Sequence, residues 1–557
     1  KGMDKYAKER VAAFILYYLE ELAESGYTYV YSNSQLMEGI VQQLGEDIPD
    51  EPITEALHDL GKKLWISEDH ERIGLSRYVN LEEKIAKKLV ELQNAKREFH
   101  FEGWQEIVKE QEEQQGWEYT DQQKEAIQMV LENQVIMISG LAGCGKTTVV
   151  KIIMEILKDY DIKQCALAGK ASARMAEVTG IPGYTIHRLL KYPSKEDMGH
   201  GGFFYNEDNF LPTDVVILDE ISMVNGWLFY SLISALAPGT KLIMLGDVGQ
   251  LESIGCLNIA HDLIVSPDVK SIELNKIHRQ AANSAIITDS IAIRNSRYTI
   301  EKDWIGCTVH GNLQDLTYDC YSDVNNTFYK VMQRVSQLIA DGNGIMDFQV
   351  IVPNKDRASG TWNLNLAIQE LCNPLPKGET ELVVSYDKDH VGSLRVGDKV
   401  INVQNNYNSV TYEGQWDEVD EEIIENMGEK TPVFNGSIGV IEAINLERKE
   451  LIVNFEGLGR LLITSAKLSS IMLGYAITVH KSQGSQAKYL VFGCDFSAYS
   501  LLTRELLYTA ITRAQEHCYV IAQTKALRYA ISQTHVSIKQ TMLVEFLNQI
   551  CHPKLTF

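Results

Sequence analysis

The segment Gly140–Thr147, with the sequence GLAGCGKT, constrains the fold more than any other feature, because it fits the pattern G-x-x-x-x-G-K-[ST]. The apolar run 135–138 precedes it, and a helical stretch, 148–157, follows it. Glycines let backbone N–H groups close around phosphate oxygens, and a helix N-terminus adds its dipole. We therefore expect a parallel α/β sheet that carries a nucleoside triphosphate site at the end of one strand.

Each polar residue of this segment has an expected role. Lys146 supplies a positive charge to the β- and γ-phosphates, and the Thr147 hydroxyl is placed to bind Mg²⁺. The other residues expected to surround the phosphates are Gly143, Cys144, Gly145 and Thr148.

Two adjacent acids, Asp219 and Glu220, follow the apolar run 215–218. An Asp at the end of a buried strand can hold Mg²⁺, and the Glu beside it can polarise an attacking water molecule. Two solvated acids at a strand end are the alternative, which the upstream phosphate loop disfavours. The pair therefore predicts hydrolysis of a nucleoside triphosphate with Mg²⁺ as the metal.

Buried strands alternate with helices along much of the chain, which indicates doubly wound sheets. The runs 135–138, 215–218 and 241–245 form one set, and 348–352, 489–492 and 518–521 form a second. Between the late strands, short runs at 399–403, 439–441 and 451–455 predict a small inserted β-barrel. The acidic stretch 417–429 is expected to be a loop within it.

The first 115 residues have a different pattern of apolar residues. Helical periodicity recurs at 11–22, 53–60 and 81–92, and the segments 64–66 and 72–75 predict a small hairpin. Helices followed by a two-stranded wing favour a winged-helix-like module, and a generic helical cap is the alternative. The segment 102–115 is expected to be a linker or a solvated helix.

Composition excludes several classes of protein. The hydrophobic fraction is 45% and the charged fraction 23%, so the chain is globular rather than disordered. No apolar run reaches the length of a membrane span, and no signal-peptide core is present, so a cytoplasmic protein with no membrane partner is expected. The nine cysteines form no CxxC pair, which argues against a zinc site.

The net charge, taken alone, favours a different class of protein. Lys plus Arg number 52 and Asp plus Glu number 75, which gives −23. Non-specific nucleic-acid binders are usually basic, so charge alone favours an enzyme of small molecules. Net charge does not describe local fields, however, and the ordered motifs below outweigh it.

Those motifs resemble the RecD-like group of superfamily 1 (SF1B) DNA helicases from about residue 20 onward. Residues 120–123 resemble the Q motif, 168–171 motif Ia, 185–190 motif Ib, 219–223 motif II, 246–255 motif III, 274–280 motif IV, 478–486 motif V and 508–514 motif VI. Segment 433–439 resembles a loop of the SH3-like insertion. Departures from the family pattern are Ala168 in motif Ia, Ile221 in motif II and Gln486 in motif V.

The resemblance implies two RecA-like domains that close on ATP. Gln123 would read the adenine, Gln250 would sense the γ-phosphate, and Arg279 and Arg513 would act as arginine fingers from the second domain. Gly484 and Gln486 would contact the nucleotide. The DNA contacts implied are Lys170, Thr185, His187, Asn435, Thr478 and His480. Either histidine taken alone would be interpreted as structural.

The family also implies a β-hairpin pin at 191–214, where Phe203 and Phe204 would stack on a fork base pair. An aromatic staple onto the neighbouring domain is the alternative. The implied domains are 1–115 (N-terminal), 116–273 (1A, with the pin), 274–379 (first part of 2A), 380–470 (SH3-like 2B) and 471–557 (rest of 2A).

The expected function is an ATP-dependent 5′-to-3′ DNA helicase in repair or recombination, acting as a monomer on single-stranded DNA and on single-strand/duplex junctions. Other recombination or replication proteins are possible partners. Two alternatives stay open: a translocase that does not unwind, and an ATP-switched subunit of a recombination complex.

Overall fold

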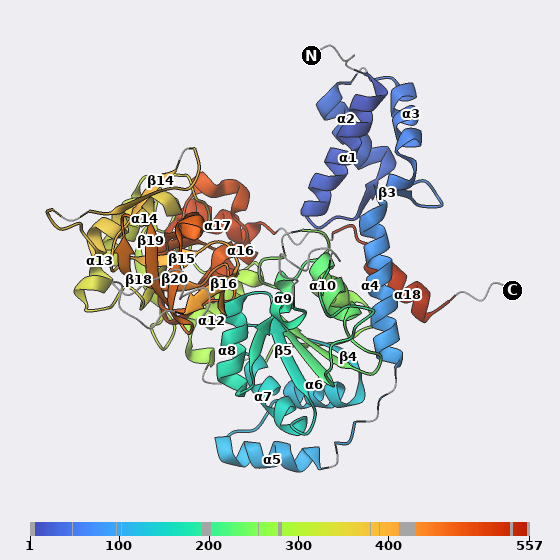
Figure 1. Ribbon diagram of the computed structural model, residues 1–557, viewed down its shortest axis with the longest axis horizontal. Helices are drawn as coiled ribbons and strands as arrows, with labels where there is room; N and C mark the ends of the chain where they lie inside the picture. Colours follow the sequence, from blue (N-terminus) through green and yellow to red (C-terminus); the bar gives the residue numbers. More distant parts are fainter. Residues whose placement is uncertain are drawn as a thin grey trace.

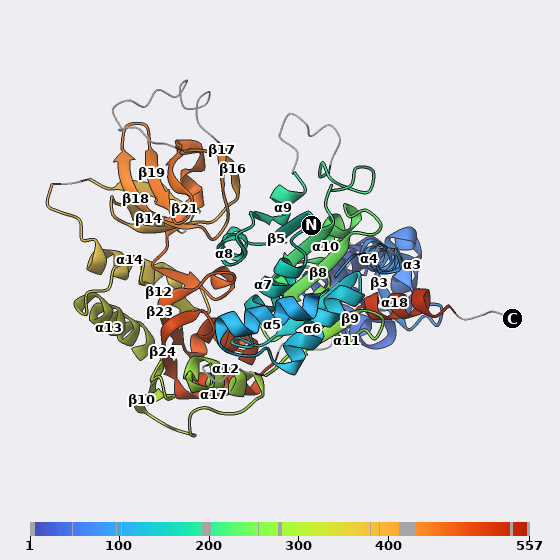
Figure 2. The same ribbon diagram turned by 90° about the horizontal axis from the view of Figure 1, so that it is seen from below.

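The computed structural model describes residues 6–553 except 47, 96, 98, 102, 192–201, 254, 277–280, 379, 389, 412–429 and 535–538. Two α/β layers lie side by side, and an N-terminal helical module extends from the first (Figure 1). Seen from below, an inserted antiparallel sheet sits beside the second layer (Figure 2). The predicted loop at 417–429 lies outside the described residues.

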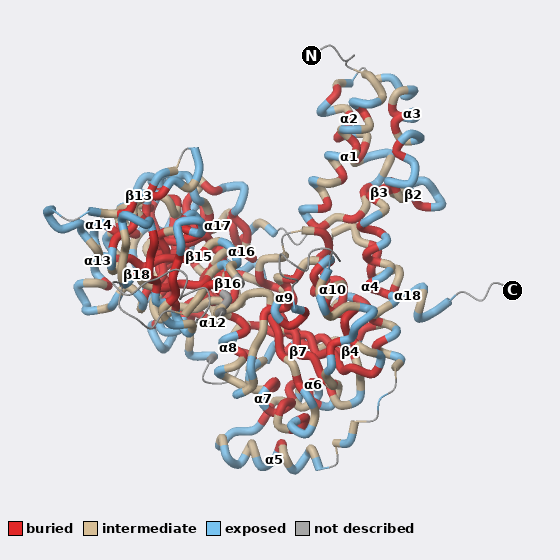
Figure 3. Tube along the Cα trace, viewed as in Figure 1, coloured by how far each residue is buried: buried red, intermediate tan, exposed pale blue. Residues whose placement is uncertain are grey.

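The first sheet is parallel throughout, in the order β6-β5-β7-β8-β4-β9. Its strands are β4 (Val135–Gly140), β5 (Ile162–Ala166), β6 (Gly183–Thr185), β7 (Val215–Asp219), β8 (Lys241–Gly246) and β9 (Lys270–Leu274). Its central strands are buried (Figure 3). The apolar runs predicted strands here because both faces of such a sheet are covered by helices.

Helices cover both faces of this sheet. In β4, Ile136 and Ile138 join one core and Met137 joins the other, as the alternation of a strand requires. One face packs on α6 (Asp121–Glu132) and α7 (Lys146–Ile156). The elements near the other face include α10 (Gly226–Ser234) and α11 (Ile259–Val265), and α8 (Gly169–Thr179) and α9 (Ile186–Leu189) complete the layer.

The second sheet has the order β10-β11-β24-β23-β12-β22, and only its β10–β11 pair is antiparallel among the described strands. Its strands are β10 (Gly306–His310), β11 (Leu316–Tyr321), β12 (Phe348–Val352), β22 (Ala476–Thr478), β23 (Ala487–Cys494) and β24 (Ala514–Gln523). Its helices are α12 (Ala285–Arg294), α13 (Asn326–Ala340), α14 (Thr361–Cys372), α16 (Arg504–Ile511) and α17 (Thr524–Ser532).

A seven-stranded antiparallel sheet is inserted between β12 and β22, as predicted, in the order β17-β16-β20-β19-β18-β15-β21. Its strands are β15 (Lys399–Asn402), β16 (Asn406–Thr411), β17 (Lys430–Val433), β18 (Ile438–Asn445), β19 (Glu450–Phe455), β20 (Gly459–Ile463) and β21 (Ile471–Leu473). A separate hairpin, β13 (Leu382–Ser385) with β14 (Val391–Leu394), precedes it.

The N-terminal module contains the predicted hairpin, with Leu64 opposite Leu75. Its elements are α1 (Lys8–Glu24), β1 (Tyr29–Tyr31), α2 (Met37–Leu44), α3 (Asp50–Leu60), β2 (Leu64–Ile66), β3 (Arg72–Leu75) and α4 (Ser76–Asn94). A third strand, β1, was not predicted, and it pairs with β3. The winged-helix-like assignment stays a prediction. The segment 102–115 contains helix α5 (Trp104–Gln115).

Helix α4 joins the module to the first sheet. Its buried residues recur every three or four positions from Tyr78 to Leu92, so one stripe of the helix faces the core along its length. That core is continuous from Val11 in α1 to Leu263 in α11.

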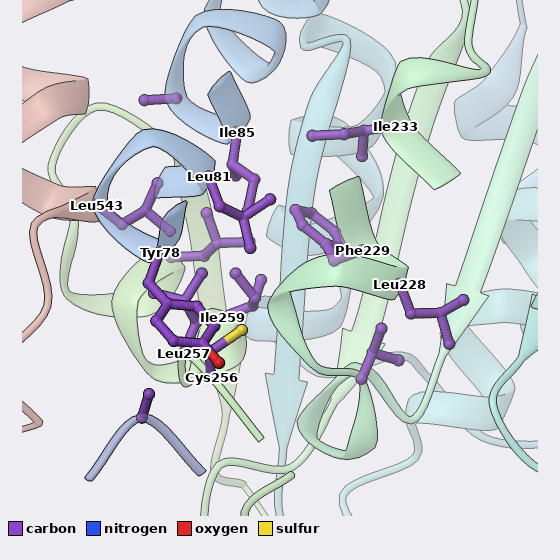
Figure 4. Close-up of a cluster of buried hydrophobic side chains, with 14 of the residues drawn as sticks. Tyr78, Leu81, Ile85, Leu228, Phe229, Ile233, Cys256, Leu257, Ile259 and Leu543 are labelled. Atoms are coloured by element: carbon purple, nitrogen blue, oxygen red, sulfur yellow. The ribbon is translucent and has the colours of Figure 1, made fainter. Parts of the chain in front are cut away.

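The C-terminal helix α18 (Leu543–Cys551) packs on α4, although the domain proposed for 471–557 placed it with the second sheet. Leu543 joins a cluster with Leu81 and Ile85 of α4 (Figure 4). Buried Glu82 accepts hydrogen bonds from the N–H groups of Met542 (2.6 Å) and Leu543 (3.1 Å), at the start of α18. The other domain boundaries stay predictions.

Candidate nucleotide site and nucleic-acid interface

The phosphate loop connects buried β4 to α7. Gly143 and Gly145 have φ angles of 75° and 81°, which only glycine adopts readily. A Cβ on Gly140 would lie 2.5 Å from the Cys144 Sγ, so glycine is also required there. Lys146 donates a hydrogen bond to the Gly140 carbonyl. The loop therefore has the shape that binds phosphate, with its lysine held close by.

The two predicted acids lie at the end of β7. The Glu220 N–H donates to the Asp219 carboxylate (2.8 Å), and Glu220 itself has a left-handed φ of 53°. Burial, with the Glu220 charge adding to it, raises the pKa of Asp219 above its usual range. A buried carboxyl with a raised pKa gains from a nearby cation, so Asp219 and Thr147 fit the expected Mg²⁺ ligands.

The cavity beside this loop has a volume of about 400 Å³ and is built from both α/β layers. The predicted residues that line it are Gly143, Gly145, Lys146, Thr147, Asp219, Glu220, Gln250, Gly484, Gln486 and Arg513. Gln250 is buried and its side-chain oxygen has no hydrogen-bond partner within the described structure. An orphaned acceptor at a cavity wall fits a ligand that donates to it, directly or through a water molecule.

Arg513 reaches the cavity from the second layer. Its side chain is buried, and its Nε donates to the Thr509 carbonyl (3.1 Å). Burial lowers the pKa of the guanidinium, and Glu220 opposes that shift. Arginine nevertheless stays charged at neutral pH, so a buried cation faces the phosphate loop across the cleft.

Three predicted nucleotide contacts do not line the cavity. The Gln123 amide oxygen accepts from the Thr120 N–H (2.9 Å), and its NH₂ donates to the Cys144 carbonyl (3.2 Å). Gln123 thus caps α6 and braces the phosphate loop. Cys144 and Thr148 are the other two, and Arg279 lies outside the described residues.

Among the charged residues that line the cavity, sequence reasoning missed two. Arg174, on the exposed side of α8, adds a cation whose charge lowers the pKa of Asp219. Asp247 follows β8 and is buried. Asp247 lies within the motif III segment, so its position was a usable signal, whereas nothing in the spacing distinguished Arg174.

The predicted DNA contacts fall at the ends of strands and in the inserted sheet. Lys170 begins α8, and its Nζ lies 3.5 Å from the Glu456 carboxylate of the inserted sheet. Phe434 of that sheet packs on Gly169, where a Cβ would lie 2.3 Å from the ring. Lys170 therefore lies beside the loop that carries Asn435, an exposed residue.

The remaining candidate DNA contacts are either hydrogen-bonded within their own segment or largely buried. The Thr185 hydroxyl caps α9 by accepting the Arg188 N–H (3.2 Å), and the Thr478 hydroxyl accepts the Lys481 N–H (3.4 Å). Burial lowers the pKa of His187 and of His480, so both rings are neutral at pH 7. Any contact from them to DNA would therefore be a hydrogen bond or stacking rather than an ion pair.

The two predicted pin aromatics occupy different environments. The Phe203 ring lies 5.7 Å from the His187 ring and packs on the core. Phe204 is 56% exposed, with the Lys191 Nζ 5.1 Å from its ring. Phe203 is thus packed within the first layer, whereas Phe204 presents an exposed ring, and both the pin and the staple roles stay predictions. Residues 192–201 of the predicted hairpin lie outside the described residues.

Three stretches match known domain families. Residues 123–256 match an AAA domain, 473–521 match the UvrD-like helicase C-terminal domain, and 364–455 match the ATP-dependent RecD-like DNA helicase SH3 domain. The last of these matches is to a domain of RecD-like helicases, and it lies between the other two along the chain. The predicted two-sheet RecD-like fold with an SH3-like insertion is thereby confirmed.

Whole-chain comparisons agree with these domain matches. The chain is 27% identical over 429 residues to the ATP-dependent RecD2 DNA helicase of Deinococcus radiodurans, covering 76% of this chain and 52% of that protein. It is 24% identical to the RecBCD enzyme subunit RecD of Mycolicibacterium smegmatis, covering 75% and 73%. The chain therefore spans about half the length of the Deinococcus relative.

Among solved structures, a Bacteroides Pif1 helicase in complex with ADP-AlF3 and ssDNA aligns with a TM-score of 0.43 at 18% identity, covering 75% of this chain and 96% of that one. Within the part of the chain that the structure describes, no helix is both long and apolar enough to cross a bilayer.

Proposed function

We propose that the chain is an ATP-dependent DNA helicase that moves 5′ to 3′ along single-stranded DNA and unwinds duplex ahead of it. The observation that carries this proposal is the cavity lined by Lys146 from one α/β layer and Arg513 from the other. A nucleotide held between them draws the two layers together, and its hydrolysis releases them.

The residues of the cavity divide the work. Lys146 and the loop amides would hold the phosphates, and Thr147 and Asp219 would hold Mg²⁺. Glu220 would orient and deprotonate the attacking water, and Arg513 would neutralise charge on the transferred phosphoryl group. Bound Mg²⁺ supplies charge neutralisation at the phosphate oxygens. Arg279 is proposed as a second finger on the resemblance alone.

Movement requires that the two layers grip DNA with different strength when open and closed. Lys170 on one layer and Thr478 on the other are candidate grips, and the inserted sheet carries Asn435. Contacts of this kind go to phosphate and sugar, so binding should be independent of sequence. The 5′-to-3′ direction, a monomeric state, a cytoplasmic location and a role in repair or recombination rest on the resemblance and the relatives.

The deciding experiment compares duplexes that carry a 5′ single-stranded tail, a 3′ tail or no tail. Unwinding of the 5′-tailed duplex alone is expected, and the Lys146→Ala variant should unwind none. Unwinding of the 3′-tailed duplex alone would refute the direction. ATPase activity stimulated by single-stranded DNA without any unwinding would favour the translocase, and no stimulation would favour an ATP-switched subunit.

A further inference from the structure

One tyrosine of the second α/β layer touches both loops that surround the phosphate position. Tyr508, on α16, is fully buried. Its hydroxyl donates a hydrogen bond to the Asp247 carboxylate and accepts one from the Ala142 N–H at 3.0 Å. Ala142 belongs to the phosphate loop and Asp247 to the loop after β8. A single hydroxyl therefore joins three segments across the interface.

The partners of Tyr508 are themselves held in place. The Asp247 carboxylate accepts the Gly249 N–H (2.9 Å) and lies 3.6 Å from Arg294 of α12. Arg294 also pairs with Glu273 at 2.9 Å. A Cβ on Gly249 would lie 2.5 Å from the Arg294 side chain, so the second layer packs closely on this loop.

Tyr508 stands behind the wall of the nucleotide cavity rather than in it. Ala142, Asp247 and Gln250 line the cavity, whereas Tyr508 does not. The Ala142 amide is therefore engaged from the second layer, on a loop whose other amides are expected to meet phosphate. A movement of Ala142 within that loop would act directly on its hydrogen bond to Tyr508.

We propose that Tyr508 is a positioning residue that couples occupancy of the phosphate loop to closure of the two layers. This inference rests on the proposed function. It identifies the side chain that couples the conformation of the ATP site to the position of the second layer. Without the hydroxyl, the half-buried Ala142 N–H loses its protein partner and Asp247 loses one donor. ATP could still bind, but binding would no longer set the position of the second layer.

A second set of contacts crosses the same interface without touching the phosphate loop. The Leu251 N–H donates to the Thr509 hydroxyl (3.0 Å), and the Gln483 amide donates to the Leu251 carbonyl (3.0 Å). These bonds can hold the layers together after Tyr508 is changed. The Tyr508→Phe variant should therefore keep its fold while losing the coupling.

Tyr475 provides a matched control. It is also fully buried, and its hydroxyl donates to the Asp398 carboxylate (3.1 Å), remote from the nucleotide cavity. Tyr475→Phe thus removes a buried tyrosine–carboxylate hydrogen bond of the same kind. Any effect that the two variants share reports on stability alone.

The first test measures ATPase kinetics with single-stranded DNA present. For Tyr508→Phe we expect kcat to fall about tenfold while KM for ATP stays within about twofold, and for Tyr475→Phe we expect both to stay within about twofold. Equal losses in the two variants would overturn the proposal. A rise in KM with unchanged kcat would also overturn it, because Tyr508 would then contribute only to binding.

The second test needs no DNA. Hydrogen exchange is followed in peptides that span 139–147 and 504–511, with and without a non-hydrolysable ATP analogue. We expect faster exchange at 139–147 in Tyr508→Phe only, and we expect the analogue to protect 504–511 in the wild type but not in this variant. An unaltered analogue response would overturn the proposal. If the wild-type ATPase ignores DNA, the proposed function fails, while this test still decides the role of Tyr508.

Discussion

The Lys170 ammonium lies 3.5 Å from the Glu456 carboxylate, so a predicted DNA contact on α8 is paired with an acid of the inserted sheet. The side chain of Glu456 is 65% exposed and that of Lys170 is 24% exposed. A DNA phosphate that binds Lys170 must therefore displace the Glu456 carboxylate of the facing domain or share the Lys170 ammonium with it.

This pairing predicts opposite effects for the two residues. Glu456→Gln should tighten single-stranded DNA binding by up to about fivefold, since an exposed ion pair is worth at most about 1 kcal/mol. Lys170→Ala should weaken binding and reduce the salt slope by about one. Fluorescence anisotropy across a salt series measures both. Lys163→Ala, which removes an ion pair with Asp161, is the control; equal effects from Lys163 and Lys170 would contradict the assignment.

The two arginines at the nucleotide cavity should differ in kinetic effect. Arg513→Ala should retain nucleotide binding and lose about 10³-fold or more in kcat, since it would remove an arginine finger. Arg174→Ala should lose less, about 10-fold to 100-fold, because it acts from the exposed side of α8. ATPase rates with nucleotide-binding titrations measure both. Arg334→Ala, whose guanidinium stacks on Tyr519, is the control. Normal ATP hydrolysis by the Arg513→Ala variant would show that Arg513 is not an arginine finger.

The exposed Phe204 should affect unwinding more than translocation. Phe204→Ala is expected to slow strand separation several-fold, on the scale of about 1–3 kcal/mol for base stacking, and to leave DNA-stimulated ATPase near the wild-type rate. Phe203→Ala should lower thermal stability instead, because its ring packs on the core. Tyr329→Ala, 71% exposed on α13, is the surface control. Unchanged unwinding in Phe204→Ala would show that this aromatic is not a pin.

Glu82 should make stability depend on pH. Burial, with the Asp262 charge adding to it, raises the pKa of Glu82 well above its usual value, while the Thr28 hydroxyl and the N–H groups of Met542 and Leu543 oppose the shift. The folded state thus binds the proton more tightly, so this contribution is greatest at low pH and is lost as pH rises through the folded-state pKa.

Glu82→Gln keeps an acceptor for α18 but cannot ionise. Its stability should match the wild type below the unfolded-state pKa of about 4.3 and exceed it increasingly as the pH rises above that value, where each unit of pKa shift is worth about 1.4 kcal/mol. Thermal unfolding at a series of pH values measures this difference. Glu83→Gln, on the exposed side of α4 beside Lys87, is the control. Parallel pH profiles for Glu82→Gln and the wild type would exclude Glu82 as the titrating group.

The features that the sequence predicted best are those that depend on residues adjacent in the chain. The strands β4, β7 and β8 contain uninterrupted apolar runs because helices cover both faces of the sheet, and the phosphate loop is one contiguous segment. Strand β1 was missed because it has three residues and pairs with β3 more than forty positions away, Tyr29 opposite Gly74. The bond between Tyr508 and Asp247 joins residues 261 positions apart, and no local pattern specifies such a pair.

The placement of α18 has a consequence for how the chain is made. The N-terminal module is synthesised before both α/β layers, yet its helix α4 packs against residues that follow them. Thr28 and Tyr29 of that module also donate backbone hydrogen bonds to Gln540. Until residue 551 has left the ribosome, the apolar stripe of α4 lacks its full cover. The module can therefore reach its final position only after residues 540–551 have been synthesised.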